Sequence, residues 1–347
     1  VTCPCALSLA TPTALSAATG NLLGRGLLTT SSRGLEMLAR CTHVVFDKTG
    51  TLTRGQPVVT DITTCTDFDR QAVINIAAAL ELPSEHPAAK AIRACANDNP
   101  LMATDIHSFP GAGIRGVVDG QDWYLGNPAF INEHCPQAVL PDTTKSGEAG
   151  TGTRILLADS TRIAAEFLLT DELRPGAADM VRRLQASGKT ILLMSGDNTA
   201  ACQHIAALTG ITEVYANMKP DDKLAHLKRL QHQGAVVAMV GDGINDAPVL
   251  AAADASIAMH GAAQISRATS DMVLLSSDLG TLASSVRLAG KTLKIIRQNL
   301  AWAASYNLLA LPAAVLGYVA PWMAAIGMSA SSLIVVLNAL RLVRTEK

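Results

Sequence analysis

The stretch that decides the fold is THVVFDKTGTLT, at residues 42–53. Its apolar, β-branched first half stops at Asp47 and then becomes polar, with a glycine three residues later. A buried parallel strand whose tip carries chemistry ends in this way. Ligands of open α/β sheets gather at the carboxyl ends of the strands, so we expect Asp47 to meet one.

Two further stretches have the same pattern, ILLMSGD at 191–197 and VVAMVGDGIND at 236–246. Helical stretches near 175–187 and 199–209, and one opened by Lys223, give the region after residue 170 a βαβ rhythm. Two pieces separated in sequence, 42–54 and 170–280, are therefore predicted to form one doubly wound α/β sheet.

The region between these pieces has a different character. Short alternating runs are separated by Gly, Pro and Asp, which predicts an inserted α+β domain with an antiparallel sheet. Residues 136–152 are expected to be a loop. The predicted strands and helices lie at 58–63, 113–118, 123–125, 154–158 and 163–169, and near 69–82 and 86–97.

Composition points to membrane-embedded segments. The 347 residues are 49% hydrophobic and only 16% charged, whereas an average soluble domain is about 25% charged. The net charge of −1 indicates no nucleic-acid partner. The seven cysteines show no pairing framework, which fits a reducing cytoplasm. Because Val1 lies inside an apolar run, we expect the chain to be the C-terminal part of a longer protein.

Two regions are predicted to cross the membrane. Residues 1–28 carry no charge before Arg25 and are expected to form one transmembrane helix with a cytoplasmic extension. Between Arg297 and Arg341 there is no charged residue, which is enough for two spans with a turn at Gly317 to Pro321. Basic residues on both sides of this hairpin place its ends in the cytoplasm. The alternative is a buried core hairpin of a soluble protein.

Three motifs carry a family resemblance: DKTGT at 47–51, SGDN at 195–198 and GDGINDAP at 241–248. They resemble the phosphorylation-domain motifs of P-type ATPases, within the haloacid dehalogenase superfamily. The resemblance implies a haloacid-dehalogenase-like phosphorylation domain with an inserted nucleotide-binding domain, plus transmembrane helices. The implied phosphorylation domain comprises 29–54, which includes a linker, and 169–290, and the nucleotide-binding domain comprises 55–168. The implied membrane parts are 1–28, one helix with the CPC motif and a cytoplasmic extension, and 291–347, two transmembrane helices and the cytoplasmic C-terminus.

The residues themselves indicate phosphoryl transfer. A carboxylate can accept a phosphoryl group, and Asp47 is the candidate. Asp242 can share a Mg²⁺ with Asp47, Ser195 offers a hydroxyl to a phosphate oxygen, and Lys223 can neutralise charge. The alternative is that these Asp residues only cap helices or turns. The resemblance adds the Thr49 carbonyl and Asp246 for the magnesium ion, and completes the catalytic set with Lys48, Thr49, Gly196, Asp197 and Asn245.

The inserted domain contains SEHP at 84–87, GAG at 111–113 and GN at 126–127. Each is weak alone, but after a P-type phosphorylation motif they resemble the ATP-binding signature of heavy-metal pumps. The resemblance assigns Glu81 and His86 to the adenine end of the nucleotide. It assigns to the nucleotide lining the residues Gly111, Gly113, Gly126 and Asn127.

The transported ion is indicated by Cys3 and Cys5, because thiolates are soft ligands that select Cu(I). Two thiolates carry enough charge to hold Cu⁺, and the uncharged hairpin lacks the carboxylate that a Zn²⁺ pump would use. CPC, YN and MxxSS together resemble the copper(I) class of heavy-metal P-type ATPases. The residues added by this resemblance are Tyr306, Asn307, Met328 and Ser332. CPCALSLATPTAL and GAAQISRATSDMVLL resemble the pumps that supply copper for cytochrome oxidase assembly.

The expected function is therefore ATP-driven export of Cu(I) through an aspartyl phosphate, with ATP and Mg²⁺ as cofactors. The protein is expected to be a multi-pass protein of the cell membrane with its phosphorylation and nucleotide domains in the cytoplasm, where a copper chaperone would deliver the ion. No TGE loop of an actuator domain occurs in the chain, so we expect this piece alone not to complete a transport cycle. The alternatives are a zinc, cadmium or lead pump, a soluble haloacid-dehalogenase-type phosphatase, and a non-enzymatic copper-binding membrane protein.

Overall fold

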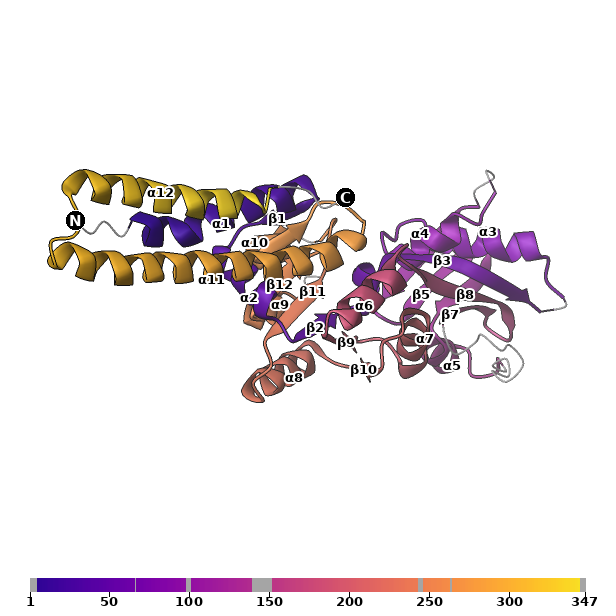
Figure 1. Cartoon of the computed structure of the whole chain (residues 1–347). Helices are drawn as coiled ribbons and strands as arrows, with labels where there is room; N and C mark the ends of the chain where they lie inside the picture. The colour runs from indigo at the N-terminus through magenta and orange to yellow at the C-terminus, as the bar shows by residue number, and fades with distance from the viewer. Residues whose placement is uncertain are drawn as a thin grey trace. The chain divides into compact units, whose positions relative to one another are not determined.

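A computed structural model describes residues 5–65, 67–97, 101–138, 152–242, 246–262 and 264–343 (Figure 1). The chain divides into two units. The first contains residues 1–51, 174–196 and 206–347, and the second contains residues 52–173 and 197–205. Most of the second unit, residues 52–173, is thus inserted between the second and third strands, in chain order, of the central sheet of the first unit.

The first unit is built on a seven-stranded sheet with the order β1-β13-β12-β11-β2-β9-β10. All neighbours are parallel except β1 and β13, which are antiparallel. This confirms the predicted doubly wound sheet. The strands are β1 (Leu27–Thr29), β2 (His43–Phe46), β9 (Thr190–Met194), β10 (Glu213–Tyr215), β11 (Val237–Gly241), β12 (Ala255–Ala258) and β13 (Met272–Leu274).

The helices around this sheet follow from local sequence signals. α8 begins at Pro220, three residues before the predicted start, because proline is pre-organised for the first helical turn. The Asp222 carboxylate accepts the Lys219 N–H (3.0 Å) and caps the same turn. The helices are α2 (Ser32–Arg40), α6 (Ala177–Ala186), α8 (Pro220–His232), α9 (Ala247–Ala252) and α10 (Gln264–Thr269), together with α7 (Thr199–Thr209), which spans the division between the units.

The second unit is an antiparallel sheet with the order β3-β8-β7-β6-β5-β4, which confirms the predicted α+β insertion. β4 and α5 were not predicted. Most of the predicted 136–152 loop, residues 139–151, lies outside the described residues. The elements are β3 (Thr53–Thr64), α3 (Arg70–Leu80), α4 (Pro87–Arg93), β4 (Ala103–Phe109), β5 (Gly113–Val118), β6 (Gln121–Gly126), α5 (Pro128–His134), β7 (Thr153–Asp159) and β8 (Ile163–Leu173).

This sheet carries helices on both faces. Leu157 packs in the core with Val73 and Leu80 of α3, whereas its neighbour Leu156 packs with Phe130 of α5. Successive side chains of a strand point to opposite faces, so α3 and α5 cover different sides. At the start of β3, the Thr53 hydroxyl and the Gly55 N–H (3.2 Å) both donate to Asp171 Oδ2 on β8.

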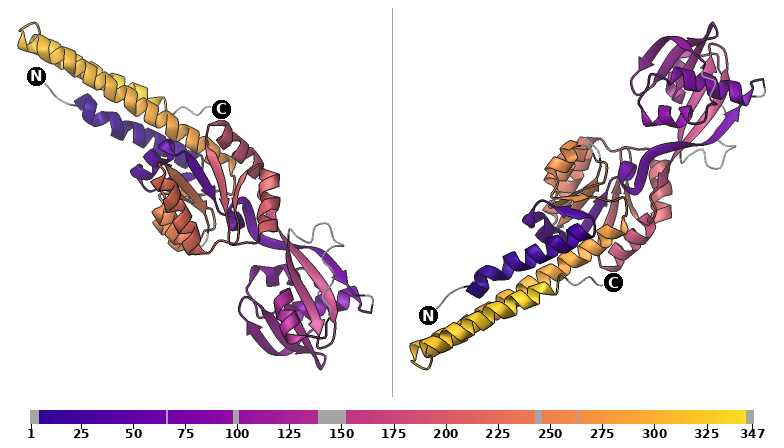
Figure 2. Two further views of the ribbon diagram at one scale, coloured as in Figure 1. Left: turned by 90° about the horizontal axis from the view of Figure 1, so that it is seen from below. Right: turned by 90° about the horizontal axis from the view of Figure 1, so that it is seen from above.

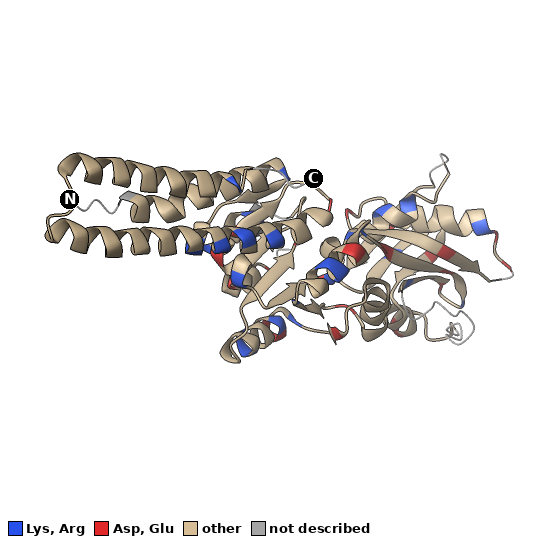
Figure 3. Cartoon of the chain, viewed as in Figure 1, with Lys and Arg blue, Asp and Glu red and all other residues tan. Residues whose placement is uncertain are grey.

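Three helices form the apolar end of the first unit: α1 (Cys5–Gly24), α11 (Gly280–Val315) and α12 (Pro321–Leu340). They lie side by side in all views (Figures 1 and 2), and Ala6 and Ala10 of α1 pack with Ala303 and Val335. Figure 3 shows no charged residue along α12 or the distal half of α11. Of the helices in the described residues, only α12 is long and apolar enough to count as a candidate membrane span.

Polar side chains link these helices near the charged end of the bundle. Asn299 is only 2% exposed, and its Nδ2 donates to the Val335 carbonyl (3.2 Å) while its Oδ1 accepts from Asn338 Nδ2 (2.8 Å). Asn21 of α1 donates to the Leu342 carbonyl, just after α12. Backbone groups of a helix form their hydrogen bonds within that helix, so contacts between helices must come from side chains. These side-chain hydrogen bonds hold the three helices in place relative to one another.

Candidate active site

Three neighbouring strands bring polar side chains to one edge of the seven-stranded sheet. β9, β2 and β11 are adjacent and parallel, and Ser195, Asp47 and Asp242 each follow the carboxyl end of one of them. The Asp47 N–H donates to the Val240 carbonyl (3.1 Å), which continues the ladder one residue beyond the strand. The strand ends selected from the sequence therefore do meet.

A buried ion-pair cluster lies at this edge. Lys223 reaches from α8, and its Nζ lies 2.6 Å from Asp47 Oδ1 and 2.8 Å from Asp246 Oδ1. The three residues are 6%, 6% and 4% exposed for Lys223, Asp47 and Asp246. Buried charges of this kind are retained only when they are paired and hydrogen-bonded, and here one ammonium faces two carboxylates.

The charge balance shifts the pKa of the nucleophile candidate. Burial raises the pKa of Asp47 to about 7, and the negative charges of Asp246 and Asp242 act in the same direction, while Lys223 opposes them. Burial alone would lower the pKa of Lys223, but the two carboxylates outweigh it and raise that pKa. The site thus holds more negative charge than its own lysine neutralises.

Asp242 is held against the turn that follows Asp47. A Cβ added to Gly50 would lie 1.5 Å from Asp242 Oδ2, and the φ of Gly50 is +73°. The Arg174 guanidinium donates to the Gly50 carbonyl (2.8 Å). Both the backbone conformation and the carboxylate therefore demand glycine here. Neither Gly50 nor Arg174 is among the predicted site residues, and the sequence signal for Gly50 is its place three residues after Asp47.

Ser195 is fixed by its backbone. Its N–H donates to the Tyr215 carbonyl (2.9 Å) and its carbonyl accepts from the Met218 N–H (3.0 Å), and it is 2% exposed. Gly196 follows it, close to the Met218 carbonyl. Asp197 belongs to the second unit. Lys48 and Thr49 lie in the turn Lys48–Leu52 directly after Asp47, and Asn245 lies outside the described residues.

The donor set at this edge fits a magnesium ion. Carboxylates and backbone carbonyls are hard oxygen ligands, and a divalent cation would offset the excess negative charge around Asp47. Thr51 is fully buried, and its hydroxyl has no hydrogen-bond partner among the described residues. In the described ranges, no group of three or more His, Cys, Asp or Glu side chains is arranged so that it could hold a metal ion by itself. Mg²⁺ does not require one, since it keeps several waters and is held by one or two carboxylates with substrate phosphates.

Four of the predicted nucleotide residues lie together in the second unit. Gly113 of β5 pairs with Gly126 of β6, and Asn127 Nδ2 donates to the Gly111 carbonyl (3.3 Å). A Cβ at Gly126 would lie 2.6 Å from the Ala112 carbonyl oxygen. These glycines therefore permit a close approach of the chain to itself, a packing requirement that the motif alone did not reveal.

Glu81 and His86 lie in the connection between α3 and α4. Burial raises the pKa of Glu81, opposed by a hydrogen bond with Ser84 and by the nearby His86 and Arg93. His86 is the N-cap of α4, and its Nδ1 accepts the Ala88 N–H (3.2 Å). Its proton therefore lies on Nε2, which leaves that atom as a hydrogen-bond donor.

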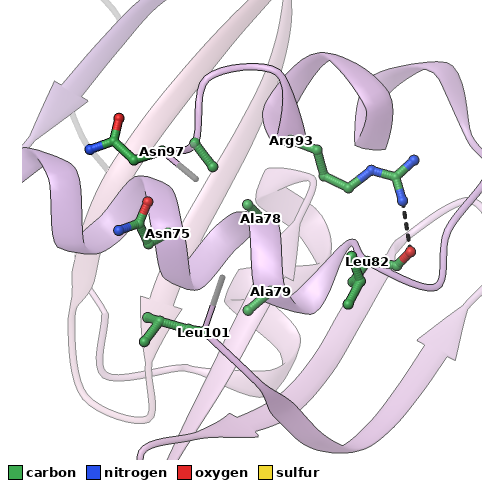
Figure 4. Close-up of a pocket in the computed structure, with 8 residues that line it drawn as sticks. Asn75, Ala78, Ala79, Leu82, Arg93, Asn97 and Leu101 are labelled. Atoms are coloured by element: carbon green, nitrogen blue, oxygen red, sulfur yellow. Dashed lines mark hydrogen bonds between the residues drawn. The ribbon is translucent and has the colours of Figure 1, made fainter. Parts of the chain in front are cut away.

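A cavity of about 150 Å³ opens beside α3, between it and the end of α4 with the segment that follows (Figure 4). Arg93 crosses its rim and donates to the Leu82 carbonyl (2.7 Å). None of the six residues predicted to bind the nucleotide lines this cavity, so it is separate from them. Its lining consists of Asn75, Ala78, Ala79, Leu82, Arg93, Ala96, Asn97 and Leu101.

The residues predicted to bind the transported ion are distributed over the helical bundle. Tyr306 and Asn307 lie on α11, and Met328 and Ser332 lie on α12. Asn307 Nδ2 donates to the Ala303 carbonyl of its own helix (2.9 Å). Cys5 is the first residue of α1, and Cys3 lies outside the described residues.

Comparisons with known proteins place this geometry in a family. A model of the haloacid dehalogenase-like hydrolases matches residues 41–254. The probable copper-transporting ATPase PacS of Synechococcus elongatus is 39% identical, over 99% of this chain and 47% of that protein. The copper-exporting P-type ATPase of Bacillus subtilis is 37% identical, over 100% of this chain and 44% of that protein. The chain thus spans about half the length of these relatives.

Solved structures give the same assignment. A zinc-transporting PIB-type ATPase in an E2.Pi state superposes with a TM-score of 0.82 at 33% identity, over 99% of this chain and 56% of that one. The catalytic domain of the CPx-ATPase CopB-B gives a TM-score of 0.65 at 29% identity, over 78% of this chain and 98% of that one. The chain therefore belongs to the haloacid dehalogenase-like hydrolase family, in the group of heavy-metal P-type ATPases.

Proposed function

We propose that this chain is the catalytic and ion-conducting part of a pump that exports Cu(I), driven by ATP through phosphorylation of Asp47. The observation that carries the proposal is the buried cluster of Asp47, Lys223 and Asp246 at the carboxyl edge of the sheet. Family membership supports it, because the curated relatives are named for copper transport.

The chemistry assigned to the cluster is a phosphoryl transfer. An Asp47 carboxylate oxygen forms a bond to the γ-phosphorus of ATP, and the bond from that phosphorus to the oxygen of the leaving ADP breaks. Asp47 must be ionised to attack, and Lys223 favours that form against burial. Mg²⁺, when bound by Asp47, Asp242, Asp246 and the Thr49 carbonyl, would neutralise phosphate charge. The Ser195 hydroxyl is assigned to a phosphate oxygen.

The second unit is assigned to ATP. Glu81 and His86 would hold the adenine, since the His86 Nε2–H is a donor that a purine nitrogen can accept. The turn containing Gly111 and the paired glycines 113 and 126 would line the rest of the nucleotide, with Asn127. Alanine at Glu81 should weaken nucleotide binding, and equilibrium dialysis with labelled ATP would measure this.

The bundle is assigned to Cu(I). Cys3 and Cys5 supply soft thiolates, and Met328 supplies a thioether. Tyr306, Asn307 and Ser332 complete the proposed pathway, in helices that carry no charged residue beyond Arg297 and before Arg341. An uncharged pathway suits a monovalent ion better than a divalent one, because no carboxylate compensates the second charge.

A zinc, cadmium or lead pump is the second candidate, and the similarity to a zinc-transporting PIB-type ATPase favours it. The two are separated by the ion that stimulates ATP hydrolysis in the protein expressed from its full reading frame. We expect stimulation by Cu⁺ and not by Zn²⁺. Stimulation by Zn²⁺ alone would replace copper with zinc in the proposal.

The decisive experiment for the chemistry is transfer of label from γ-labelled ATP. The variant Asp47→Asn should take up no label, because an amide oxygen is a far weaker nucleophile. Asp61→Asn is the matched control, since Asp61 is an exposed residue of β3, and should label as the unmodified protein does. Label retained on the Asp47→Asn protein would refute the assignment of the nucleophile.

The proposed location is the cell membrane, with several spans and both soluble units in the cytoplasm, where a copper chaperone would donate the ion. The basic residues Lys291, Lys294 and Arg297 at the start of the apolar part of α11 support this orientation. Cys65 is an exposed thiol of the second unit. A membrane-impermeant maleimide should label it, relative to a Cys65→Ser variant, only from the cytoplasmic side.

A further inference from the structure

One glycine of α12, Gly327, faces the side chain of Tyr306 on α11. A Cβ added to Gly327 would lie 2.6 Å from the Tyr306 hydroxyl oxygen, but 3.5 Å from Cζ and 3.6 Å from Cε2 of the same ring. The first distance is shorter than real Cβ contacts allow, and the other two are ordinary contacts. Only the oxygen of Tyr306 therefore depends on the missing side chain.

The backbone at Gly327 gives no other reason for a glycine. It lies inside α12, with ordinary helical geometry, where glycine is less favourable than alanine. Small residues at such positions let one transmembrane helix approach another closely. The choice of glycine is thus explained by the Tyr306 hydroxyl and not by the fold of α12 itself.

The neighbouring contacts fix the register of the two helices. One turn before Tyr306, Trp302 Nε1 donates to the Ser331 hydroxyl (3.2 Å), one turn after Gly327. Ala303 and Val335 pack in the core of the bundle beside them. The contact between Tyr306 and Gly327 is therefore the next step of a regular antiparallel helix pair, and it brings the phenol oxygen to the α12 backbone one residue before Met328.

We infer that Gly327 is a positioning residue for the transported ion: its lack of a side chain lets the Tyr306 hydroxyl lie against α12 beside Met328. The inference rests on the proposed function, in which both of these residues contact the ion. Gly327→Ala would push the Tyr306 hydroxyl, and the ring that carries it, away from α12. The expected consequence is weaker ion binding, without loss of the phosphorylation chemistry.

The test is a double-mutant cycle of Gly327→Ala and Tyr306→Phe in the protein expressed from its full reading frame. Thermal unfolding in detergent is the first measurement. Gly327→Ala should give a lower unfolding temperature than Gly290→Ala, because both gain helix propensity but only the first meets the Tyr306 oxygen. In the Tyr306→Phe background, Gly327→Ala should behave as Gly290→Ala does, because phenylalanine removes the clashing oxygen. Gly290→Ala on α11 is the matched control: it is also a helical glycine, but a Cβ there meets nothing within 4 Å, so it should not lower the unfolding temperature.

The second measurement is the Cu⁺ concentration that half-activates ATP hydrolysis. Gly327→Ala should raise it about five- to tenfold, as expected when one positioned polar contact to a ligand is weakened, with a smaller change in the maximal rate. Adding Gly327→Ala to Tyr306→Phe should change it no further. Additive effects of the two substitutions in the unfolding cycle would overturn the inference, and so would an unchanged activation constant in Gly327→Ala.

The two measurements separate this inference from the proposed function. The unfolding cycle needs no metal, so it tests the contact whichever ion is carried. If Zn²⁺ and not Cu⁺ activates the unmodified protein, the copper assignment fails, and the activation constant is then measured with Zn²⁺. Gly327 is still supported as a positioning residue if the two substitutions are non-additive in the unfolding cycle and Gly327→Ala raises the Zn²⁺ concentration that half-activates ATP hydrolysis.

Discussion

Gly50 allows the Asp242 carboxylate to lie against the turn that follows Asp47. We predict that Gly50→Ala destabilises the protein and abolishes phosphorylation, because its Cβ would overlap the Asp242 carboxylate at 1.5 Å. The positive φ alone costs about 1–2 kcal/mol for alanine. Gly188→Ala is the control for that strain, since its φ is +79° and a Cβ there meets nothing within 4 Å.

Chemical denaturation measures both variants. Gly50→Ala should lose about 1–3 kcal/mol more than Gly188→Ala, the range in which overpacking of a packed site falls, and only Gly188→Ala should retain labelling from ATP. Equal stability losses would mean that Asp242 moves away without cost.

The buried carboxylate of Asp47 makes stability depend on pH. Its pKa is raised from an ordinary 3.8 to about 7, so the folded protein keeps a proton that the unfolded chain has lost. The resulting destabilisation grows as pH rises between these values and is complete above pH 7. Without divalent cations, Asp47→Asn should therefore be more stable than the unmodified protein at pH 8, on the order of 2–4 kcal/mol, and equally stable near pH 4.

Scanning calorimetry across this pH range, with and without Mg²⁺, checks the sign. Mg²⁺ should reduce the difference at pH 8, since it favours the ionised carboxylate. The opposite sign would be a stability difference between Asp47→Asn and the unmodified protein that becomes less favourable to the variant from pH 4 to pH 8. That result would show that Lys223 affects the pKa of Asp47 more than burial does.

At this scale the sequence was informative where chemistry follows strand ends. Asp47, Ser195 and Asp242 could be selected because an apolar run stops at each of them. The contact between Asp242 and Gly50 could not be predicted, because it joins residues from different strands across a turn. Lys223 pairs with both Asp47 and Asp246, and this likewise could not be predicted, because it depends on the direction of α8, which no local pattern specifies.

At the scale of elements, the pair β3 and β8 contains a testable contact. Thr53→Val should destabilise the second unit by about 1–3 kcal/mol, because it removes a donor to Oδ2 of the half-buried Asp171. Valine keeps the shape and the strand propensity of threonine. Thr63→Val on the same strand is the control, since that hydroxyl contacts only Asp61 at the surface (3.2 Å).

Urea unfolding followed by tryptophan fluorescence suits this comparison, because Trp123 lies in the core of the second unit. Thr63→Val should stay within about 0.5 kcal/mol of the unmodified protein. If both valines have the same small effect, the Thr53 hydrogen bond contributes nothing net to the stability of this unit.

Elements with a visible sequence period were predictable, whereas two of the three-residue strands were not. The alternation in β5 and the apolar run of β9 span enough residues to show a period. β1 and β10 have three residues each, too few for any period, and they exist because neighbouring strands supply their hydrogen bonds. α5 was missed for a different reason: its N-cap Asn127 is assigned only to the nucleotide lining, and Pro128 at the first helical position is not considered.

At the scale of the whole molecule, the exposed leucines of α11 distinguish a lipid-facing surface from a water-facing one. Leu309 is 74% exposed. If it faces lipid, Leu309→Lys should hinder membrane insertion, at a cost of about 2.5–3.5 kcal/mol. Leu82→Lys is the control, because Leu82 is also exposed, at 54%, but lies in the second unit.

The measurement is the fraction of protein that stays in the membrane after an alkaline carbonate wash. The Leu82→Lys protein should stay with the membrane, whereas part of the Leu309→Lys protein should be extracted or degraded. Extraction of the unmodified protein together with both variants would favour the soluble alternative for this hairpin. Composition predicted membrane segments from the deficit of charge, but the single continuous helix from Gly280 to Val315 could not be read from it.

The short connection between α1 and the sheet has a mechanical consequence. Only Arg25 and Gly26 separate the end of α1 from β1, and β1 is bonded to β13 at the margin of the sheet through three residue pairs. Because the connection has only two residues, a translation of α1 along its axis must either move β13 as well or break the hydrogen bonds of those three pairs. A displacement of α1, which begins at Cys5, is therefore transmitted to the sheet that also contains β2, the strand just before Asp47.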